Sequence, residues 1–364
     1  MHKQFLLTAL EAARQNRGFC SPNPAVGAVM VQDGRVIAQA SHKGVGHAHA
    51  EQALIHSMAN HDLSKITLYV TLGPCNHWGK TPPCVKAIIE SGIKKVVFAA
   101  KDPNPIVACN DSSALLREQD IEVIHYPLEE IDAFYHSYRH WLKSKKPFVT
   151  AKLAISIDGK VAGINGTRIA ISSIDANCFT HQKRLASDAI LTTHATVSND
   201  DPLLNVRLGS DVIAKPVIVL DRKLQLSSTA KIYSSAEKLI VFHDEKLVSD
   251  NKLKEIIGSD NGHKASATYI GCRCRDDQLD LNAVLLKLGE MGFHDIWVEA
   301  GSILFEQLHE LGLVNQTYLY VAPKVIGEQA TSMQLSPSFF ESMKSISWQQ
   351  MGKDAVASIT WGKK

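Results

Sequence analysis

The sequence predicts an α/β protein of two domains, and three observations lead to this prediction. Strand-like and helix-like segments alternate along both halves of the chain. The length of 364 residues is enough for two domains that each bury a core. The charged run KSKKP, at 143–147, separates the two alternating series and is interpreted as a linker. We therefore place the domains at residues 1–145 and 148–364.

The first domain is expected to begin with a helix that ends near Gly18, because apolar residues from Phe5 to Ala13 recur at helical spacing. Asp33 and Gly34 favour a hairpin turn. In chain order, the other expected elements are strands over 25–31 and 35–40, a helix over 50–58, a strand over 66–72, a helix over 84–92, and strands over 94–100 and 121–126. They predict a sheet with helices on its faces, an α/β/α domain.

The second domain begins with the strand-like segment FVTAKLAIS at 148–156. Its other expected strands cover 216–221, 238–242, 295–301 and 317–323. Internal repeats and low-complexity segments are absent from the sequence. This half is therefore predicted to be a second α/β domain.

Composition argues against several classes of protein. The net charge of +2 gives no sign of a polyanion partner. No apolar run approaches the roughly 20 residues that cross a bilayer, and the amphipathic first segment does not resemble a signal peptide. Seven cysteines at irregular spacings argue against a disulfide framework. We expect a cytoplasmic protein with no membrane or nucleic-acid partner.

A histidine and two cysteines of the first domain have the pattern of a catalytic zinc site. His49 and Glu51 form an H-x-E motif. Cys75 and Cys84 are the two cysteines of the segment PCNHWGKTPPC, at 74–84. H-x-E followed by P-C and a second cysteine is the signature of zinc deaminases. One nitrogen and two sulfur ligands leave a fourth tetrahedral position for water, as a catalytic zinc requires. We predict one zinc ion on His49, Cys75 and Cys84, with Glu51 as the catalytic proton carrier.

The expected helix starts make this set geometrically possible. Residues two apart on a helix point to different sides, so His49 and Glu51 converge only if His49 lies at the helix cap. Cys75 and Cys84 are expected where a loop enters a helix, whose positive end favours a thiolate. The prolines stiffen the loop that carries both cysteines.

Other histidines and cysteines fit the metal site less well. His42, His47 and His77 lie nearby, but none stands two residues before a glutamate at a helix start. Cys272 and Cys274 have a different spacing and no histidine close by. These two cysteines are interpreted as structural, together with Cys20, Cys109 and Cys178.

The first domain resembles the deaminase half of the bifunctional riboflavin-biosynthesis deaminase/reductases. HAE at 49–51, PCNHWGKTPPC with eight residues between its cysteines, PNPAVGAVM and DPNP carry this resemblance. It implies a cytidine-deaminase-like fold whose long loop covers a free pyrimidine nucleotide and not a nucleic-acid base. Asn23, His42 and Lys80 would then contact the substrate, with Lys80 standing where the family more often has an arginine.

Taken without a resemblance, the second half carries weaker signals. No G-x-G-x-x-G is present, so a Rossmann nucleotide domain is not predicted. The small residues Ala300-Gly301-Ser302 follow a strand and precede a helix, where a phosphate could approach backbone N–H groups. Packing alone also explains small residues at such a turn, so this signal leaves both alternatives open.

The second half is similar to the reductase half of the same family. KLAISIDGKVA, RLASDAILTTHATVSNDDPLLNVR, VEAGSIL and YVAPKVIG carry the similarity. It implies a dihydrofolate-reductase-like fold in which NADPH reduces a ribosyl group to a ribityl chain. The residues that it assigns to the substrate are Lys152, Ser172, Arg184, Leu204, Arg207 and Glu299. Those that it assigns to NADPH are Ala154, Thr196, Asp200, Gly301 and Ser302.

One segment of this half departs from the family pattern. A tryptophan usually precedes the isoleucine here, whereas this chain has Ala170-Ile171-Ser172. Arg168 also stands near a position that is usually small and polar. The cofactor contacts of this segment are therefore left open. Judged on the residues alone, the cations assigned to the substrate would be solvated surface charges.

Together these patterns predict a bifunctional enzyme of riboflavin biosynthesis. The first domain would hydrolyse the 2-amino group of 2,5-diamino-6-(5-phosphoribosylamino)pyrimidin-4-one, and the second would reduce the ribose of the deaminated product with NADPH.

Two alternatives to this function remain. A polynucleotide deaminase is disfavoured by the near-neutral charge and the 7% of aromatic residues. A binding protein with structural zinc is disfavoured by the open fourth position. The resemblance favours a homodimer or larger homo-oligomer.

Overall fold

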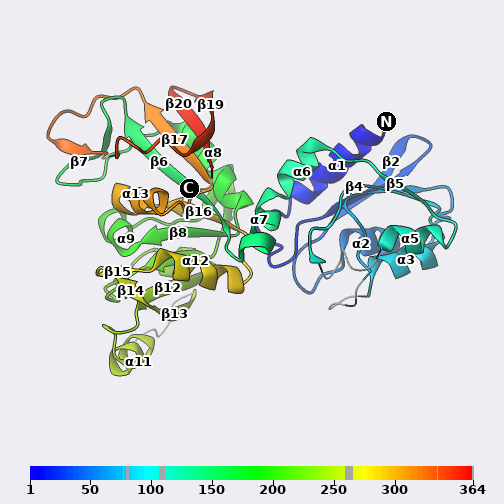
Figure 1. Ribbon diagram of the computed structural model, residues 1–364, viewed down its shortest axis with the longest axis horizontal. Helices are drawn as coiled ribbons and strands as arrows, with labels where there is room; N and C mark the ends of the chain where they lie inside the picture. Colours follow the sequence, from blue (N-terminus) through cyan, green and yellow to red (C-terminus); the bar gives the residue numbers. More distant parts are fainter. Residues whose placement is uncertain (77, 79–81, 106–110, 259–264, 334, 363–364) are drawn as a thin grey trace. The chain divides into compact units, whose positions relative to one another are not determined.

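The computed structural model describes residues 1–364 except 77, 79–81, 106–110, 259–264, 334 and 363–364. The chain divides into two compact units, Met1–Lys145 and Lys146–Lys364, each with its own sheet (Figure 1). The charged run at 143–147 includes the last turn of a helix, α7, rather than forming an extended linker throughout. Within the described parts of the chain, no helix is both long enough and apolar enough to span a bilayer.

The first unit is built from short, alternating elements. In chain order they are α1 (His2–Arg14), β1 (Gly27–Gln32), β2 (Arg35–Ser41), α2 (Ala50–Ser57), β3 (Thr67–Leu72), α3 (Cys84–Ser91), β4 (Lys95–Ala100), α5 (Ser112–Arg117), β5 (Glu122–His125), α6 (Glu129–Phe134) and α7 (His136–Ser144). Every element expected from the sequence is present. The first helix ends at Arg14, earlier than the expected end near Gly18.

The sheet of the first unit has helices on both faces (Figure 1). Its strand order is β2-β1-β3-β4-β5, with β3, β4 and β5 parallel and β1 antiparallel to both of its neighbours. Along β1, Val29 and Val31 pack on the α1 side, whereas Ala28 and Met30 pack on the α2 side, because side chains alternate along a strand. Both faces are therefore buried, as an α/β/α domain requires.

Two local features hold β1 in place. Asp33 and Gly34 both have positive φ, 49° and 75°, the geometry of a tight hairpin turn between β1 and β2. At Gly27 a Cβ atom would lie 2.0 Å from the carbonyl oxygen of Ala9, so only glycine lets α1 pack this closely on the strand. The expected turn is thus present where the sequence placed it.

The second unit contains more strands than the sequence indicated. In chain order its elements are β6 (Phe148–Ser156), β7 (Lys160–Ile164), α8 (Ile174–Ala186), β8 (Ala189–Thr193), α9 (His194–Asp200), β9 (Val206–Leu208), β10 (Asp211–Ile213), β11 (Val217–Leu220), α10 (Ile232–Ser235), β12 (Lys238–Asp244), α11 (Asp250–Gly258), β13 (Ser266–Cys272), β14 (Cys274–Arg275), β15 (Gln278–Leu279), α12 (Leu281–Glu290), β16 (Asp295–Glu299), α13 (Ser302–Glu310), β17 (Gln316–Ala322), β18 (Ala330–Ser332), β19 (Met343–Met351) and β20 (Asp354–Trp361).

A nine-stranded sheet forms the centre of the second unit, in the order β13-β12-β11-β8-β16-β6-β17-β20-β19. The strands from β13 to β17 are parallel, and β20 and β19 complete the sheet as an antiparallel pair. Apolar clusters cover both faces. The carboxyl ends of β8, β11 and β16 lie side by side at one edge, which is where open α/β sheets bind ligands.

Candidate active sites

The three predicted zinc ligands meet at one point in the first unit. His49 Nδ1 lies 3.2 Å from Cys84 Sγ and 3.5 Å from Cys75 Sγ. Their ligand atoms all lie within 4.8 Å of one another, and no other group of three or more potential metal ligands occurs among the described residues. Both cysteines are buried. One imidazole and two thiols at these distances suit a zinc ion.

The backbone explains why this set converges. His49 is the N-cap of α2 and has an extended conformation (φ −65°, ψ 159°). The helical spacing that would separate residues two apart therefore does not apply to His49 and Glu51. Cys84 is the first residue of α3, and its N–H donates to Cys75 Sγ at 3.4 Å. Both the N–H and the helix start favour negative charge on sulfur.

The site favours one thiolate before any metal binds. A hydrogen bond from Cys84 lowers the pKa of Cys75, and the contact with His49 lowers this pKa further. The same bond to Cys75, together with burial, raises the pKa of Cys84. The Cys75 hydrogen bond also raises the pKa of His49 despite the burial of its ring. These shifts favour the thiolate at Cys75 rather than at Cys84.

Glu51 is a buried carboxyl beside these ligands. It is 4% exposed, and burial, reinforced by the charge of Cys75, raises its pKa to about 7. A carboxyl with a pKa near 7 can take up and release a proton at neutral pH, which is the requirement for a general acid and base.

Of the three predicted substrate contacts of the first unit, the structure describes Asn23 and His42. His42 is buried and lies with its ring 5.2 Å from that of His49. Its Nδ1 lies 3.1 Å from the carbonyl oxygen of Ala48, and its Nε2 lies 3.1 Å from the amide nitrogen of Asn23. Both ring nitrogens of His42 thus have protein partners. Lys80, and the alternative ligand His77, fall outside the described residues.

The other histidines and cysteines that the structure describes do not join the metal cluster. His47 is exposed. The thiol of Cys20 donates to the carbonyl oxygens of Asn16 and His42, a structural role. Cys272 and Cys274 lie on β13 and β14 of the other unit, Cys178 is exposed, and Cys109 falls outside the described residues.

Sequence reasoning missed two buried tyrosines of the first unit. Tyr135 is buried, and its hydroxyl contacts Thr71 at 2.7 Å and donates to the Ala25 carbonyl at 3.0 Å. Tyr138, on α7, reaches Asp102 of the DPNP segment at 3.5 Å. Neither stands next to a motif in the sequence, so only the apolar periodicity of their helices could have marked them as buried.

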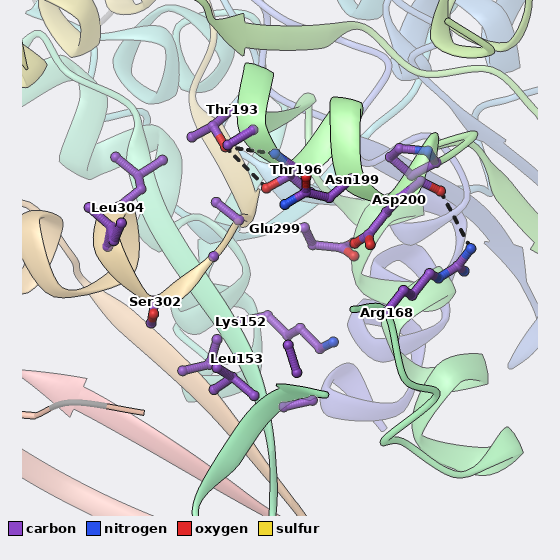
Figure 2. A pocket seen from close by; sticks show the side chains of 18 of the residues that line it. Lys152, Leu153, Arg168, Thr193, Thr196, Asn199, Asp200, Glu299, Ser302 and Leu304 are labelled. Atoms are coloured by element: carbon purple, nitrogen blue, oxygen red, sulfur yellow. Dashed lines mark hydrogen bonds between the residues drawn. The ribbon is translucent and has the colours of Figure 1, made fainter. Parts of the chain in front are cut away.

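A cavity of about 860 Å³ lies at the carboxyl ends of the central strands in the second unit (Figure 2). All eleven residues that the resemblance assigned to the reductase site line it. They come from segments 150 positions apart, from Lys152 on β6 to Ser302 on α13. A pocket of this size is typical of cofactor sites.

An ion pair crosses the wall of this cavity. Arg184 donates to the two carboxylate oxygens of Glu299 at 2.5 and 2.8 Å, and Trp297 donates to the same carboxylate at 2.7 Å. Burial alone would raise the pKa of Glu299, but the charge and hydrogen bonds of Arg184 outweigh it and lower the pKa to about 2. Glu299 therefore stays ionised at neutral pH.

Lys152 projects into the same open centre as Glu299 (Figure 2). Its Nζ makes no hydrogen bond with any residue that the structure describes and lies 5.0 Å from the ring centre of Tyr320. Burial lowers the pKa of Lys152, although the charge of Glu299 opposes this shift. A lysine in this state can release a proton more readily than a solvated one.

Two helix starts border another part of the cavity. Thr193 caps α9 by accepting the N–H of Thr196 at 3.2 Å, and the two hydroxyls lie 3.1 Å apart (Figure 2). Helix α13 starts at Ser302 after Gly301, and no side chain caps it. The N–H groups at this helix start can donate hydrogen bonds to a phosphate of a dinucleotide.

The segment that departs from the family pattern also lines the cavity. Arg168 donates to the carbonyl oxygen of Asp200 at 3.4 Å (Figure 2). The carbonyl oxygen of Ala170 accepts a hydrogen bond from Lys324 at 2.5 Å. The backbone of this segment is therefore tied to the protein although the tryptophan is missing.

The chain matches two family models, one in each unit. The cytidine and deoxycytidylate deaminase zinc-binding region matches residues 1–100. The RibD C-terminal domain matches residues 147–357.

Relatives and solved structures match along nearly the whole chain. The riboflavin biosynthesis protein RibD of Actinobacillus pleuropneumoniae is 36% identical over 332 residues, which cover 89% of this chain and 84% of that protein. The Escherichia coli protein of the same name is 31% identical, covering 90% and 89%. A Thermotoga maritima diaminohydroxyphosphoribosylaminopyrimidine deaminase/5-amino-6-(5-phosphoribosylamino)uracil reductase superposes with a TM-score of 0.82 at 29% identity, covering 99% of this chain and 98% of that one.

Proposed function

The chain belongs to the RibD family of riboflavin-biosynthesis proteins, and we propose that its two units catalyse consecutive reactions on one pyrimidine nucleotide. It is a bifunctional deaminase and reductase that uses zinc and NADPH. We assign deamination of a diaminopyrimidinone ribose phosphate to residues 1–145 and reduction of 5-amino-6-(5-phosphoribosylamino)uracil to residues 148–364. The observation that carries this assignment is the placement of a His/Cys/Cys cluster beside a buried acid in one unit and of a large cavity in the other.

In the deaminase unit, His49, Cys75 and Cys84 would hold the zinc. Bound there, zinc supplies a Lewis acid that acidifies a water molecule. Glu51 would take a proton from that water, whose oxygen bonds to the ring carbon, and would pass the proton to the departing amine, so that ammonia leaves. The raised pKa of Glu51 supports this role, because both of its protonation states are then accessible at neutral pH. Asn23, His42 and Lys80 would hold the substrate, with Asn23 kept in place by its contact with His42.

In the reductase unit, bound NADPH would be the source of a hydride for the sugar carbon that carries the amine. Lys152 would donate the accompanying proton, because its buried ammonium group has no hydrogen-bond partner among the described residues. Ser172, Leu204, Arg207 and the Arg184–Glu299 pair would bind the substrate. Ala154, Thr196, Asp200, Gly301 and Ser302 would bind NADPH, with the start of α13 receiving a phosphate.

We also propose that two copies of the chain associate through β19. This nine-residue edge strand has no buried residue, and it exposes Ile346 by 39% and Trp348 by 59%. A long edge strand that exposes large apolar side chains is prone to pair with another strand, and a second copy offers an identical one. Sedimentation should detect a dimer that Trp348→Glu weakens. A monomeric wild-type protein would contradict this assembly.

A cytoplasmic location is proposed as well. The zinc site needs both thiols reduced, and the cytoplasm keeps cysteines in that state.

The experiment that tests the function uses the full chain in two steps. The protein is incubated first with the diaminopyrimidinone nucleotide alone and then with NADPH added. Ammonia should appear in the first step, and NADPH oxidation should require the second. If NADPH is consumed before any ammonia is released, the proposed order of the reactions is wrong.

A further inference from the structure

Asn205 lies behind the cavity wall of the second unit, between two arginines. It is 5% exposed, and it follows Leu204, which lines the cavity. Its backbone carbonyl accepts a hydrogen bond from Arg184 Nη1 at 2.8 Å. Its side-chain oxygen accepts a hydrogen bond from Arg207 Nη1. The amide must turn its oxygen to Arg207, because a guanidinium group can only donate.

The backbone around Asn205 is shaped for these two contacts. Leu204 has a φ of +47°, which is uncommon for a residue with a branched side chain and costs conformational energy. On the other side, the N–H of Arg207 donates to His181 Nδ1 of helix α8 at 3.1 Å. Asn205 is thus fixed between a strained residue and a strand that is tied to α8.

The two arginines are consequently not equivalent. Arg184 is buried, and all three of its side-chain nitrogens donate to Glu299 or to Asn205. Arg207 is exposed at the cavity, and its Nε and Nη2 have no hydrogen-bond partner among the described residues. Only Arg207 of this pair has an unused edge for a bidentate contact with an anion.

We propose that Asn205 is a positioning residue that holds Arg207 toward the phosphate of the sugar and so sets the preference of the reductase for a phosphorylated substrate. The inference rests on the reductase function proposed above. The amide orients the guanidinium without neutralising its charge, whereas an aspartate of the same size would compete with the phosphate. Asn205 contacts no substrate itself, since it lies behind the lining of the cavity.

The test compares the proposed reductase substrate with the same compound lacking its phosphate. The measured quantity is the ratio of kcat/KM for the two compounds. Arg207→Ala should lower this ratio about 10- to 150-fold, the range for a charge-assisted hydrogen bond. Asn205→Ala should lower it less, about 2- to 10-fold, because it removes the hydrogen bond that orients the guanidinium and leaves the guanidinium itself in place. In the Arg207→Ala background, Asn205→Ala should have no further effect on the ratio, because the two residues act through one contact.

Asn205→Asp is the matched variant that keeps size and acceptor oxygens. It should lower the ratio at least about tenfold while thermal unfolding and deamination stay at wild-type values, because its carboxylate pairs with Arg207. An unchanged ratio in this variant overturns the proposal. Equal losses on both compounds in Asn205→Ala would also overturn it and leave a packing role. If the wild-type protein reduces neither compound, the reductase function itself fails, and this proposal fails with it.

Discussion

The two buried glutamates of this protein have opposite pKa shifts. Burial raises the pKa of Glu51 in the first unit to about 7, and the opposing charge of His49 does not outweigh it. Burial acts in the same direction on Glu299 in the second unit, but Arg184 outweighs it and lowers the pKa to about 2. The same type of side chain therefore has a pKa near neutrality in one site and far below it in the other, and the paired arginine is the main cause of the difference.

The two sites also differ in how their residues are distributed along the chain. The metal cluster comes from residues 49–84, with His49 and Cys84 at the starts of two helices and Cys75 in the loop before the second one. The cavity of the second unit gathers residues from 152 to 331, on strands, helices and loops that become neighbours only in the folded domain. A change in the first site should therefore leave the second intact, and the predictions below test this independence.

The largest effect is expected for Cys84→Ser. Removing one of three protein ligands should release zinc and reduce deamination by more than about 100-fold, since even changes outside the ligand set cost 10- to 100-fold. Metal analysis and ammonia release measure the two losses. Reduction of the second substrate should be unaffected. Full zinc occupancy in this variant would show that the ligand assignment is wrong.

Arg184→Ala should destabilise the second unit without affecting the stability of the first. It leaves the ionised, buried carboxylate of Glu299 without its bidentate partner, which costs about 3–5 kcal/mol in comparable sites. Thermal unfolding should show one early transition, with reduction lost and deamination retained. Arg184→Lys keeps the charge without the bidentate geometry and should give a smaller shift. An unaltered unfolding profile for Arg184→Ala would contradict the proposed weight of this ion pair.

Glu51→Gln tests the proton-carrying role directly. The amide keeps the size of the side chain but cannot shuttle protons, so deamination should fall by about 100-fold or more. Zinc content should remain normal, because Glu51 is not a ligand. Ammonia release near the wild-type rate would remove Glu51 from the mechanism.

The smallest effect is expected for removal of the whole second unit. The fragment 1–145 should deaminate within about twofold of the full chain, because its proposed ligands and catalytic acid all lie within one compact unit. Ammonia release by the purified, zinc-loaded fragment measures this. A folded fragment with zinc but without activity would show that the first site borrows residues from elsewhere.

Much of the first unit could be read from the sequence because its signals are local. The hairpin at Asp33-Gly34 and the helix starts at His49 and Cys84 follow from turn chemistry, spacing and prolines within a few positions. The second unit has fewer such signals. Its β19–β20 pair was not expected, since β19 is exposed on both faces and shows no alternation of buried and exposed residues.

The sequence by itself determined the α/β class and the His49, Cys75 and Cys84 set with Glu51, whereas the eleven residues assigned to the reductase site came from the family resemblance. Only the tertiary structure decided which of those residues pair with one another. Arg184 and Glu299 are 115 positions apart, so no spacing rule could pair them. This ion pair occupies Arg184, whereas Arg207 keeps one edge of its guanidinium group without a partner among the residues that the structure describes. Asn205 accepts a hydrogen bond from each of the two arginines, and its proposed positioning role follows from this placement. A hydrogen bond depends on the distance between two atoms in space. Spacing along the sequence predicts that distance only within a single helix or strand.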